Sequence, residues 1–278
     1  MTNTAVSRSA VRRQATVIAV FLAALAFVYV VLVLTPQGQW LDSGAFGALG
    51  ILGVPFGSES EAIRWGGVFL LAAGAIAAWI SAVVRRRWRD ALTAALVVAI
   101  STLSCEALKV VLPRPALGVI GYDDNTFPSG HMALAFSAAL AIAITDPLPR
   151  WRRQVVACAF GLTIVVGWAS TISFAHRPSD VMGAGLVVAV VMSAVSLDRP
   201  PDSVPRPLRT ALAWCVLLSA ALIAVGRPLS VVAAPPGDAL EAMGWLVLCA
   251  APVVAVVFFA PAARPAEQWS RGAPWTRD

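Results

Sequence analysis

Long apolar runs are the feature of this sequence that most constrains how the chain folds. A helix of about 20 apolar residues is long enough to cross a hydrocarbon core of roughly 30 Å. Runs of that kind recur along the chain, with polar segments between them. An even number of crossings would place both ends of the chain on one side of the membrane. The sequence predicts about eight spans, at residues 15–34, 65–84, 91–111, 130–144, 154–175, 181–197, 211–225 and 239–260.

The composition supports this interpretation. Hydrophobic residues make up 59% of the chain and charged residues 13%, and the mean hydropathy is +0.78. Soluble domains carry a larger charged share, about 25%. The four cysteines all fall inside predicted spans and show no zinc-ligand spacing, so neither a disulfide framework nor a metal site is expected. We therefore expect an all-α fold, a polytopic membrane helix bundle.

The basic residues orient the predicted spans. Of the 21 basic residues, 16 flank the span ends on one side of the membrane. By the positive-inside rule that side is cytoplasmic, and both termini are expected there. Topology thus accounts for the net charge of +6, and no nucleic-acid partner is expected. The remaining five basic residues lie on the extracytoplasmic side: Arg64, Lys109, Arg114, Arg177 and Arg227.

A polar hinge, Phe127–His131, separates two apolar runs and carries one of the two histidines of the chain. Pro128 interrupts a helix and Ser129 is a preferred N-cap, so a helix is expected to begin at Gly130. The main-chain N–H groups at such a start form an anion site, and glycine lets a ligand approach the backbone. The hinge therefore predicts phosphate binding, although an ordinary capped helix start has the same pattern.

Two basic residues lie close together after the third predicted span. Lys109 is the only lysine of the chain and falls in the last helical turn before Pro113, and Arg114 follows. A snorkelling lysine paired with Glu106, one turn earlier, is an alternative explanation for Lys109. It leaves Arg114 unexplained. Two basic residues in an extracytoplasmic loop, where such residues are rare, predict an anion held there.

The second histidine opens the segment His176–Asp180. Asp180 follows His176 by four residues, a spacing that places two side chains on one face of a helix. A carboxylate there fixes the tautomer of the imidazole and raises the basicity of its other nitrogen, as nucleophilic histidine chemistry requires. Alternatively, Asp180 caps the next helix and His176 is a surface residue. The grouping of both histidines with three of the five extracytoplasmic basic residues favours a shared site.

Residues 35–63 are expected to form an external loop that is rich in glycine. Its middle, Phe46–Phe56, is apolar. This part is expected to lie along the membrane surface, to re-enter the membrane or to be a simple packed connection. No chemical role is assigned to the loop.

The order of these motifs resembles the signature of the type 2 phosphatidic acid phosphatases. The matching residues are Lys109 with Arg114-Pro115, then Pro128–His131, then His176 with Asp180. The second motif matches fully. In the family six residues separate the first-motif lysine from its Arg-Pro, whereas four do so here.

The third motif also departs from the family pattern. The family has an arginine six residues before the histidine, and Ser170 stands at that position. Arg177, next to His176, is a candidate to bind the same phosphate from another backbone position. The motifs cover about residues 91–197 of the chain.

The resemblance implies a six-helix membrane core and removal of phosphate from lipid phosphates or diphosphates, with no metal or other cofactor. His176 would attack phosphorus, Asp180 would hold the other nitrogen of that ring, and His131 would protonate the leaving oxygen and then activate water. The expected phosphate-binding residues are Lys109, Arg114, Ser129, Gly130 and Arg177. The expected division of the chain is an N-terminal segment 1–14, a core 15–200, two additional transmembrane helices within 201–260 and a tail 261–278.

The excess of arginine over lysine indicates a GC-rich bacterial genome, so the expected location is the bacterial cytoplasmic membrane with an extracytoplasmic site. The expected partners are membrane lipids and a lipid phosphate substrate: a polyprenyl diphosphate, a polyprenyl phosphosugar or a glycerophospholipid phosphate. Two other functions stay open at this point. One is a transferase that passes the phosphoryl or phosphatidyl group to an acceptor other than water. The other is a lipid-binding or transport protein without catalysis.

Overall fold

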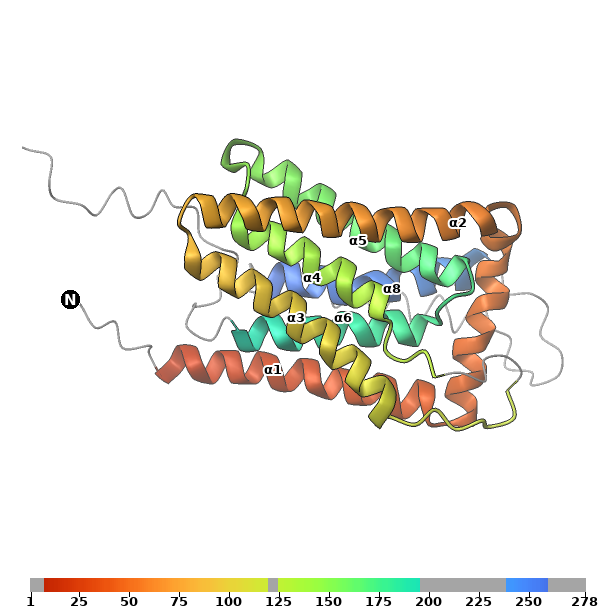
Figure 1. The fold of residues 1–278 in the computed structure, drawn as a ribbon. Coiled ribbons are helices and arrows are strands. Elements are labelled where there is room, and N and C mark those ends of the chain that lie inside the picture. The colour runs from red at the N-terminus through yellow and green to blue at the C-terminus, as the bar shows by residue number, and fades with distance from the viewer. Residues whose placement is uncertain (1–7, 120–124, 196–238, 260–278) are drawn as a thin grey trace, which may run out of the picture.

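The computed structural model describes residues 8–119, 125–195 and 239–259. Within these residues every regular element is helical, and the helices lie alongside one another as a bundle (Figure 1). The predicted all-α bundle is therefore confirmed. The elements are α1 (Arg8–Val28) with a π-helical continuation (Tyr29–Val33), α2 (Pro36–Val84), α3 (Trp88–Val111), α4 (Gly130–Thr145), a 3-10 turn (Pro149–Trp151), α5 (Arg152–Ile172), α6 (Pro178–Val195) and α8 (Ala239–Phe259).

The lengths and hydropathy of these helices are those of a multi-pass membrane protein. Helix α4 (Gly130–Thr145) and the apolar part of α8 (Glu241–Val256) are shorter than a full span. Seven of the predicted spans overlap a described helix, and the span predicted at 211–225 lies outside the described residues. The stretches long and apolar enough to cross a membrane are Gln14–Val33, Ser58–Val84, Trp88–Val111, Pro149–Ile172 and Pro178–Val195.

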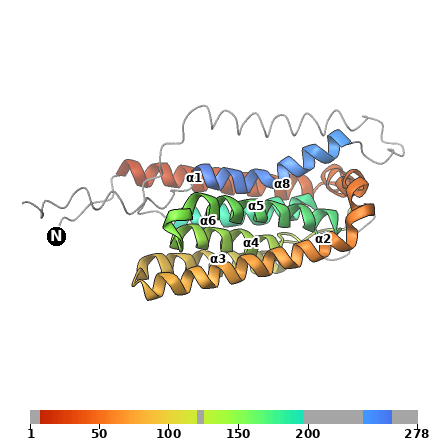
Figure 2. The same cartoon turned by 90° about the horizontal axis from the view of Figure 1, so that it is seen from above.

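Helices α4 and α6 form the centre of the bundle. Helix α4 packs against α2, α3, α5 and α6, and α6 packs against α1, α3, α4 and α8. Figure 2 shows α4, α5 and α6 between α2 and α3 on one side and α1 and α8 on the other. The outer helices present large apolar side chains outward, such as Val20, Phe69 and Leu103. That arrangement suits a surface surrounded by lipid chains.

Small residues let the central helices approach their neighbours. A Cβ atom at Gly185 of α6 would lie 2.6 Å from Cβ of Pro252 in α8. A Cβ atom at Gly183 would overlap the ring of Phe127, which is fully buried. The glycine at 183 therefore allows the segment before α4 to pack against α6, which positions the start of α4.

The first part of α2 differs from the loop expected at residues 35–63. The helix begins at Pro36, and the hydroxyl oxygen of Thr35 accepts a hydrogen bond from the N–H of Gly38 at 2.9 Å. An N-cap threonine followed by proline is a favourable helix start. The side chains of Ala45, Ala48 and Leu49 are fully buried, and this burial offsets the cost of glycine in a helix, about 1 kcal/mol for each.

Residues 36–57 of α2, which we name the crossing segment, run across one end of the bundle before the helix turns to run along it (Figure 1). The loop after α3 is attached to this segment, because the side-chain amide of Gln39 donates to the carbonyl of Pro115 at 2.7 Å. The crossing segment therefore covers the end of the bundle where the predicted motifs lie.

Arginines hold the opposite end together. The guanidinium group of Arg85, at the end of α2, donates to the carbonyl of Pro147 at 3.0 Å. That of Arg87 donates to the carbonyl of Thr145 at 2.7 Å. The α2–α3 connection and the end of α4 therefore lie at one end, and the start of α4 lies at the other.

Candidate active site

Three segments that are distant in sequence meet at the end of the bundle that the crossing segment covers. They are the end of α3 with the loop after it, the start of α4 and the start of α6. The N–H of Ser129 donates to the carbonyl of Asp180 at 3.0 Å and joins the last two. Asn125 joins the first two: its amide donates to the carbonyl of Lys109 at 2.9 Å, and its side-chain oxygen accepts from the N–H of Phe127 at 3.1 Å.

The start of α4 has the geometry predicted for the hinge. The helix begins at Gly130, and the hydroxyl oxygen of Ser129 accepts from the N–H of Met132 at 3.3 Å, so the predicted N-cap is confirmed. A Cβ atom at residue 130 would lie 2.5 Å from Oε1 of Glu106 and 3.2 Å from Nζ of Lys109. Glycine at this position therefore lets the charged groups of α3 reach the helix start.

The two histidines face each other. Nδ1 of His131 lies 3.5 Å from Nε2 of His176, and which of them carries a proton depends on the tautomers. His176 is buried and His131 is half-buried. The ring of Trp65 from α2 contacts the ring of His131 edge-on, with centroids 4.4 Å apart. The structure thus brings together the two histidines that the sequence places 45 residues apart.

Asp180 lies on the other side of His176. Its Oδ2 is 3.7 Å from Nδ1 of His176, which is an ion-pair distance rather than a hydrogen bond. That Nδ1 is buried and has no hydrogen-bond partner among the described residues. Oδ2 accepts instead from the hydroxyl of Thr126 at 2.6 Å and from the N–H of Arg177 at 3.0 Å. Asp180 is therefore held in place next to the ring nitrogen that faces away from His131.

Arg114 lies at the centre of a buried cluster. Its side chain is 4% exposed, and its Nη atoms lie 3.0 Å from Oδ1 of Asp180 and 3.2 Å from Oδ2 of Asp42. They also donate to the hydroxyl oxygens of Thr126 at 3.1 Å and Ser179 at 3.4 Å. We name these five residues the ion-pair cluster. The structure thus places Arg114 against two carboxylates, whereas a phosphate is the partner expected from the sequence.

Sequence reasoning missed three members of this cluster, Asp42, Thr126 and Ser179, of which Asp42 carries a charge. Asp42 lies in the crossing segment, is fully buried and accepts hydrogen bonds from both the N–H and the hydroxyl of Ser179. Burial, and then the neighbouring charge of Asp180, raises the pKa of Asp42 to about 6, although Ser179 and Arg114 act in the opposite direction. Asp42 is the only carboxylate among residues 35–57, and this was the available signal.

The other two predicted cations have different surroundings. Nζ of Lys109 lies 2.8 Å from Oε1 of Glu106, and the two side chains are 24% and 58% exposed. This pair is the alternative that the sequence offered for Lys109. The Arg177 side chain is 3% exposed, and its main-chain N–H supports Asp180. Lys109 therefore lies beside the α4 start, and Arg177 lies beneath the surface.

The electrostatics of the histidine pair favour an anionic ligand. Coulombic interactions link His131 to two cations, Arg64 and Lys109, and to one carboxylate, Glu106. The described part of the chain holds no group of three or more His, Cys, Asp or Glu side chains placed to hold a metal ion. Cations and titratable rings of this kind are groups that can hold and protonate an oxyanion.

A comparison with known protein families identifies the segment that carries this site. Residues 90–204 match the PAP2 superfamily. The resemblance predicted from the sequence is therefore confirmed, and a phosphatase that acts on phosphate esters is supported. Neither a curated protein nor a solved structure matches the chain.

The PAP2 segment begins with α3 and includes α4, α5 and α6, so both histidines, Lys109 and Arg114 fall inside it. The site also uses α2, which lies outside the segment. From α2 come Asp42, Arg64 and Trp65. The unusual extracytoplasmic position predicted for Arg64 was a signal for it, whereas Trp65 gave none.

Proposed function

We propose that the protein is a membrane-embedded phosphatase that hydrolyses a lipid phosphate or diphosphate through a phosphohistidine intermediate. The histidine pair carries this proposal: Nε2 of His176 faces His131 at 3.5 Å, and Nδ1 of the same ring faces Asp180 at 3.7 Å. A nucleophilic imidazole needs one nitrogen available to the substrate and a carboxylate near the other. A second titratable ring nearby is suited to general acid catalysis.

In the first step Nε2 of His176 attacks the terminal phosphorus, the bond between that phosphorus and the bridging oxygen of the leaving group breaks, and His131 gives its proton to the departing oxygen. In the second step His131 takes a proton from water, which attacks phosphorus and breaks the P–N bond. The products are inorganic phosphate and the lipid with one phosphate fewer, and both histidines return to their starting state. Asp180 stabilises the positive charge that His176 gains when it attacks.

The phosphate oxygens are assigned to groups at the α4 start. The main-chain N–H groups of Gly130 and His131 at this helix start, and the ammonium group of Lys109 beside it, are the donors that we assign to these oxygens. Charge on these oxygens must be stabilised during phosphoryl transfer. Ser129 contributes through the cap that fixes this turn, and Gly130 lets the ammonium group of Lys109 approach the helix start.

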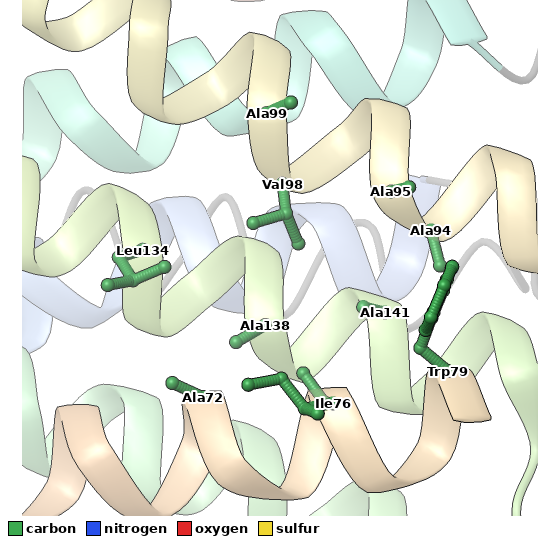
Figure 3. Close-up of a pocket in the computed structure, with 11 residues that line it drawn as sticks. Ala72, Ile76, Trp79, Ala94, Ala95, Val98, Ala99, Leu134, Ala138 and Ala141 are labelled. Carbon is green, nitrogen blue, oxygen red and sulfur yellow. The ribbon is translucent and has the colours of Figure 1, made fainter. Parts of the chain in front are cut away.

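An apolar groove supports a lipid as the substrate. It lies between α2, α3 and α4, has a volume of about 310 Å³ and is lined by apolar side chains (Figure 3). Leu134, Ala138 and Ala141 line it from α4, and they follow His131 by three, seven and ten residues. Residues at that spacing share one helix face. A hydrocarbon chain in the groove would therefore place its phosphate next to His131.

The orientation in the membrane is part of the proposal. Arg85, Arg87 and Arg152 lie at the end of the bundle opposite the histidines. The positive-inside rule assigns that end to the cytoplasm and the site to the extracytoplasmic face. In a bacterial cytoplasmic membrane, polyprenyl diphosphates and phosphosugars as well as glycerophospholipid phosphates would be accessible from there.

The test is release of inorganic phosphate by the detergent-purified protein in excess chelator. The substrates are a polyprenyl diphosphate, phosphatidic acid and phosphatidylglycerol phosphate. We expect release from at least one of them and its loss in His176→Ala, with incorporation of ³²P into the wild-type protein as an acid-labile phosphohistidine. Release that needs a divalent metal, or that persists in His176→Ala, would contradict the mechanism.

A further inference from the structure

Arg64 is a buried arginine that the proposed mechanism does not use. It lies near the start of the membrane span of α2, and its side chain is 9% exposed. Its ion pair with Glu61 is long, 3.4 Å from Nη2 to Oε1, and the Glu61 side chain is 64% exposed. Its Nε is buried without a hydrogen-bond partner among the described residues. A buried guanidinium group with an unsatisfied donor destabilises the fold unless a ligand accepts the missing hydrogen bond.

The packing of α2 against α5 places Arg64 at the same height along the bundle axis as the histidine pair. A Cβ atom at Gly67 of α2 would lie 2.5 Å from Cγ2 of Val166 in α5, so these residues lie opposite each other. The two helices run in opposite directions, as Figure 1 shows. Arg64 lies one turn from Gly67 towards the histidine end, and Ala169 lies one turn from Val166 in the same direction. Arg64 and Ala169 are therefore at the same level across the helix contact.

His176, the proposed nucleophile, lies at the same height along the bundle axis as Ala169 and Ser170. The carbonyl of Ser170 accepts a hydrogen bond from the N–H of His176 at 3.0 Å. Ala169 and Ser170 are both buried and both small, so neither side chain extends far towards the facing helix. Ser170 is the position where the family resemblance implies an arginine. A guanidinium group from α2 can thus reach the region that an arginine of α5 would occupy.

A second contact connects Arg64 to the acid. Cζ of Arg64 lies 5.6 Å from the centroid of the Trp65 ring, and the same ring contacts His131 edge-on at 4.4 Å. The cation–π contact restricts where the guanidinium group points. The Coulombic link between Arg64 and His131 agrees with this proximity.

The geometry points to Arg64 as a phosphate-binding residue, which holds a non-bridging oxygen of the substrate on the α5 side of the histidine pair. The inference rests on the proposed phosphatase function and adds a ligand for its phosphate. Arg114 differs, because two buried carboxylates already surround its guanidinium group. Arg64 has only a solvent-exposed carboxylate as an ion-pair partner among the described residues.

The experiment compares Arg64→Gln, Arg64→Lys and Arg64→Ala with the wild type. For Arg64→Gln we expect kcat/KM to fall about 10²-fold, as when one donor to a transition-state oxyanion is removed. We expect the inhibition constant of inorganic phosphate to rise about tenfold or more, because a charge-assisted hydrogen bond is lost. Arg64→Lys should retain more activity than Arg64→Gln, and added guanidinium ion should restore part of the activity of Arg64→Ala.

Two variants serve as controls. Arg89→Gln removes an exposed arginine at the opposite end of the bundle and should leave both constants unchanged. Glu61→Gln removes the ion-pair partner of Arg64 and should leave phosphate inhibition unchanged or make it stronger. Thermal unfolding in detergent shows whether each variant is folded. Line broadening of inorganic phosphate in ³¹P NMR measures binding without turnover.

The outcomes separate this inference from the proposed function. If folded Arg64→Gln hydrolyses the substrate and binds phosphate as the wild type does, Arg64 is not a ligand and the phosphatase function stands. If guanidinium ion does not restore a folded Arg64→Ala variant while Glu61→Gln is equally impaired, the role of Arg64 is structural. If the wild type neither binds phosphate nor releases it from any substrate, the proposed function fails and this inference fails with it.

Discussion

The ion-pair cluster and the histidine pair lie side by side, yet the carboxylate partners of their cations differ in burial. In the cluster the guanidinium group of Arg114 lies within 3.2 Å of two fully buried carboxylates. Next to the histidine pair, Lys109 and Arg64 have carboxylate partners that are 58% and 64% exposed. Solvent screens the charge of exposed carboxylates, so these partners neutralise the two cations only weakly. The two cations can therefore attract an anionic ligand more strongly. The comparison agrees with the proposed function, in which the cluster stabilises the fold and the histidine pair, with its cations, binds the substrate.

Arg114→Met is the strongest test of this division. The substitution leaves two buried carboxylates without their cation, and breaking a buried pair in this way costs about 3–5 kcal/mol. We expect a large fall in the unfolding midpoint in detergent. The double variant Arg114→Met/Asp42→Asn, which also removes one carboxylate, should recover part of the loss. A single variant as stable as the wild type would show that the cluster is not a framework.

Asp42→Asn examines the same cluster through its pH dependence. The folded-state pKa of Asp42, about 6, lies above its ordinary value of 3.8, so the folded protein binds this proton more tightly than the unfolded chain does. The stabilisation is complete below pH 4 and is lost as the pH rises through 6. The unfolding midpoint of the wild type relative to Asp42→Asn should therefore fall between pH 4 and pH 7. A difference that stays constant or rises would contradict the assignment.

Lys109→Met gives the smallest expected change in stability. Its ion pair with Glu106 is largely exposed, and such pairs contribute about 0–1 kcal/mol. The activity should respond more, with kcat/KM falling about tenfold or more if the ammonium group holds a phosphate oxygen. Parallel melting curves and rate measurements check both expectations. A stability loss as large as that of Arg114→Met would remove the distinction between the two regions.

The parts of the site that follow local rules could be predicted from the sequence. The N-cap at Ser129 depends on residues within one turn, and the Lys109–Glu106 pair on residues three apart. The meeting of His131 and His176 follows from counting spans, because both loops fall at the same end of the bundle. These features need no knowledge of tertiary packing.

The partners of Arg114 could not be predicted in the same way. Asp42 and Asp180 are 72 and 66 residues away along the chain, and only packing of the crossing segment brings Asp42 there. The glycines of that segment favour a loop in a local analysis, and buried contacts override the preference. The sequence likewise showed Arg64 as a basic residue on the side of the membrane where such residues are rare. Its height along the bundle axis relative to Ser170 depends on how α2 and α5 pack.

The hydrogen bond between the N–H of Ser129 and the carbonyl of Asp180 connects the two histidine-bearing segments through main-chain atoms. Any residue type other than proline at position 129 supplies that N–H, and every residue type at position 180 supplies that carbonyl. The connection between the two backbone segments is thus part of the fold and does not depend on the side chains at positions 129 and 180. Neighbouring side chains, and the accepted headgroup with them, can therefore change while the two histidine-bearing segments stay joined.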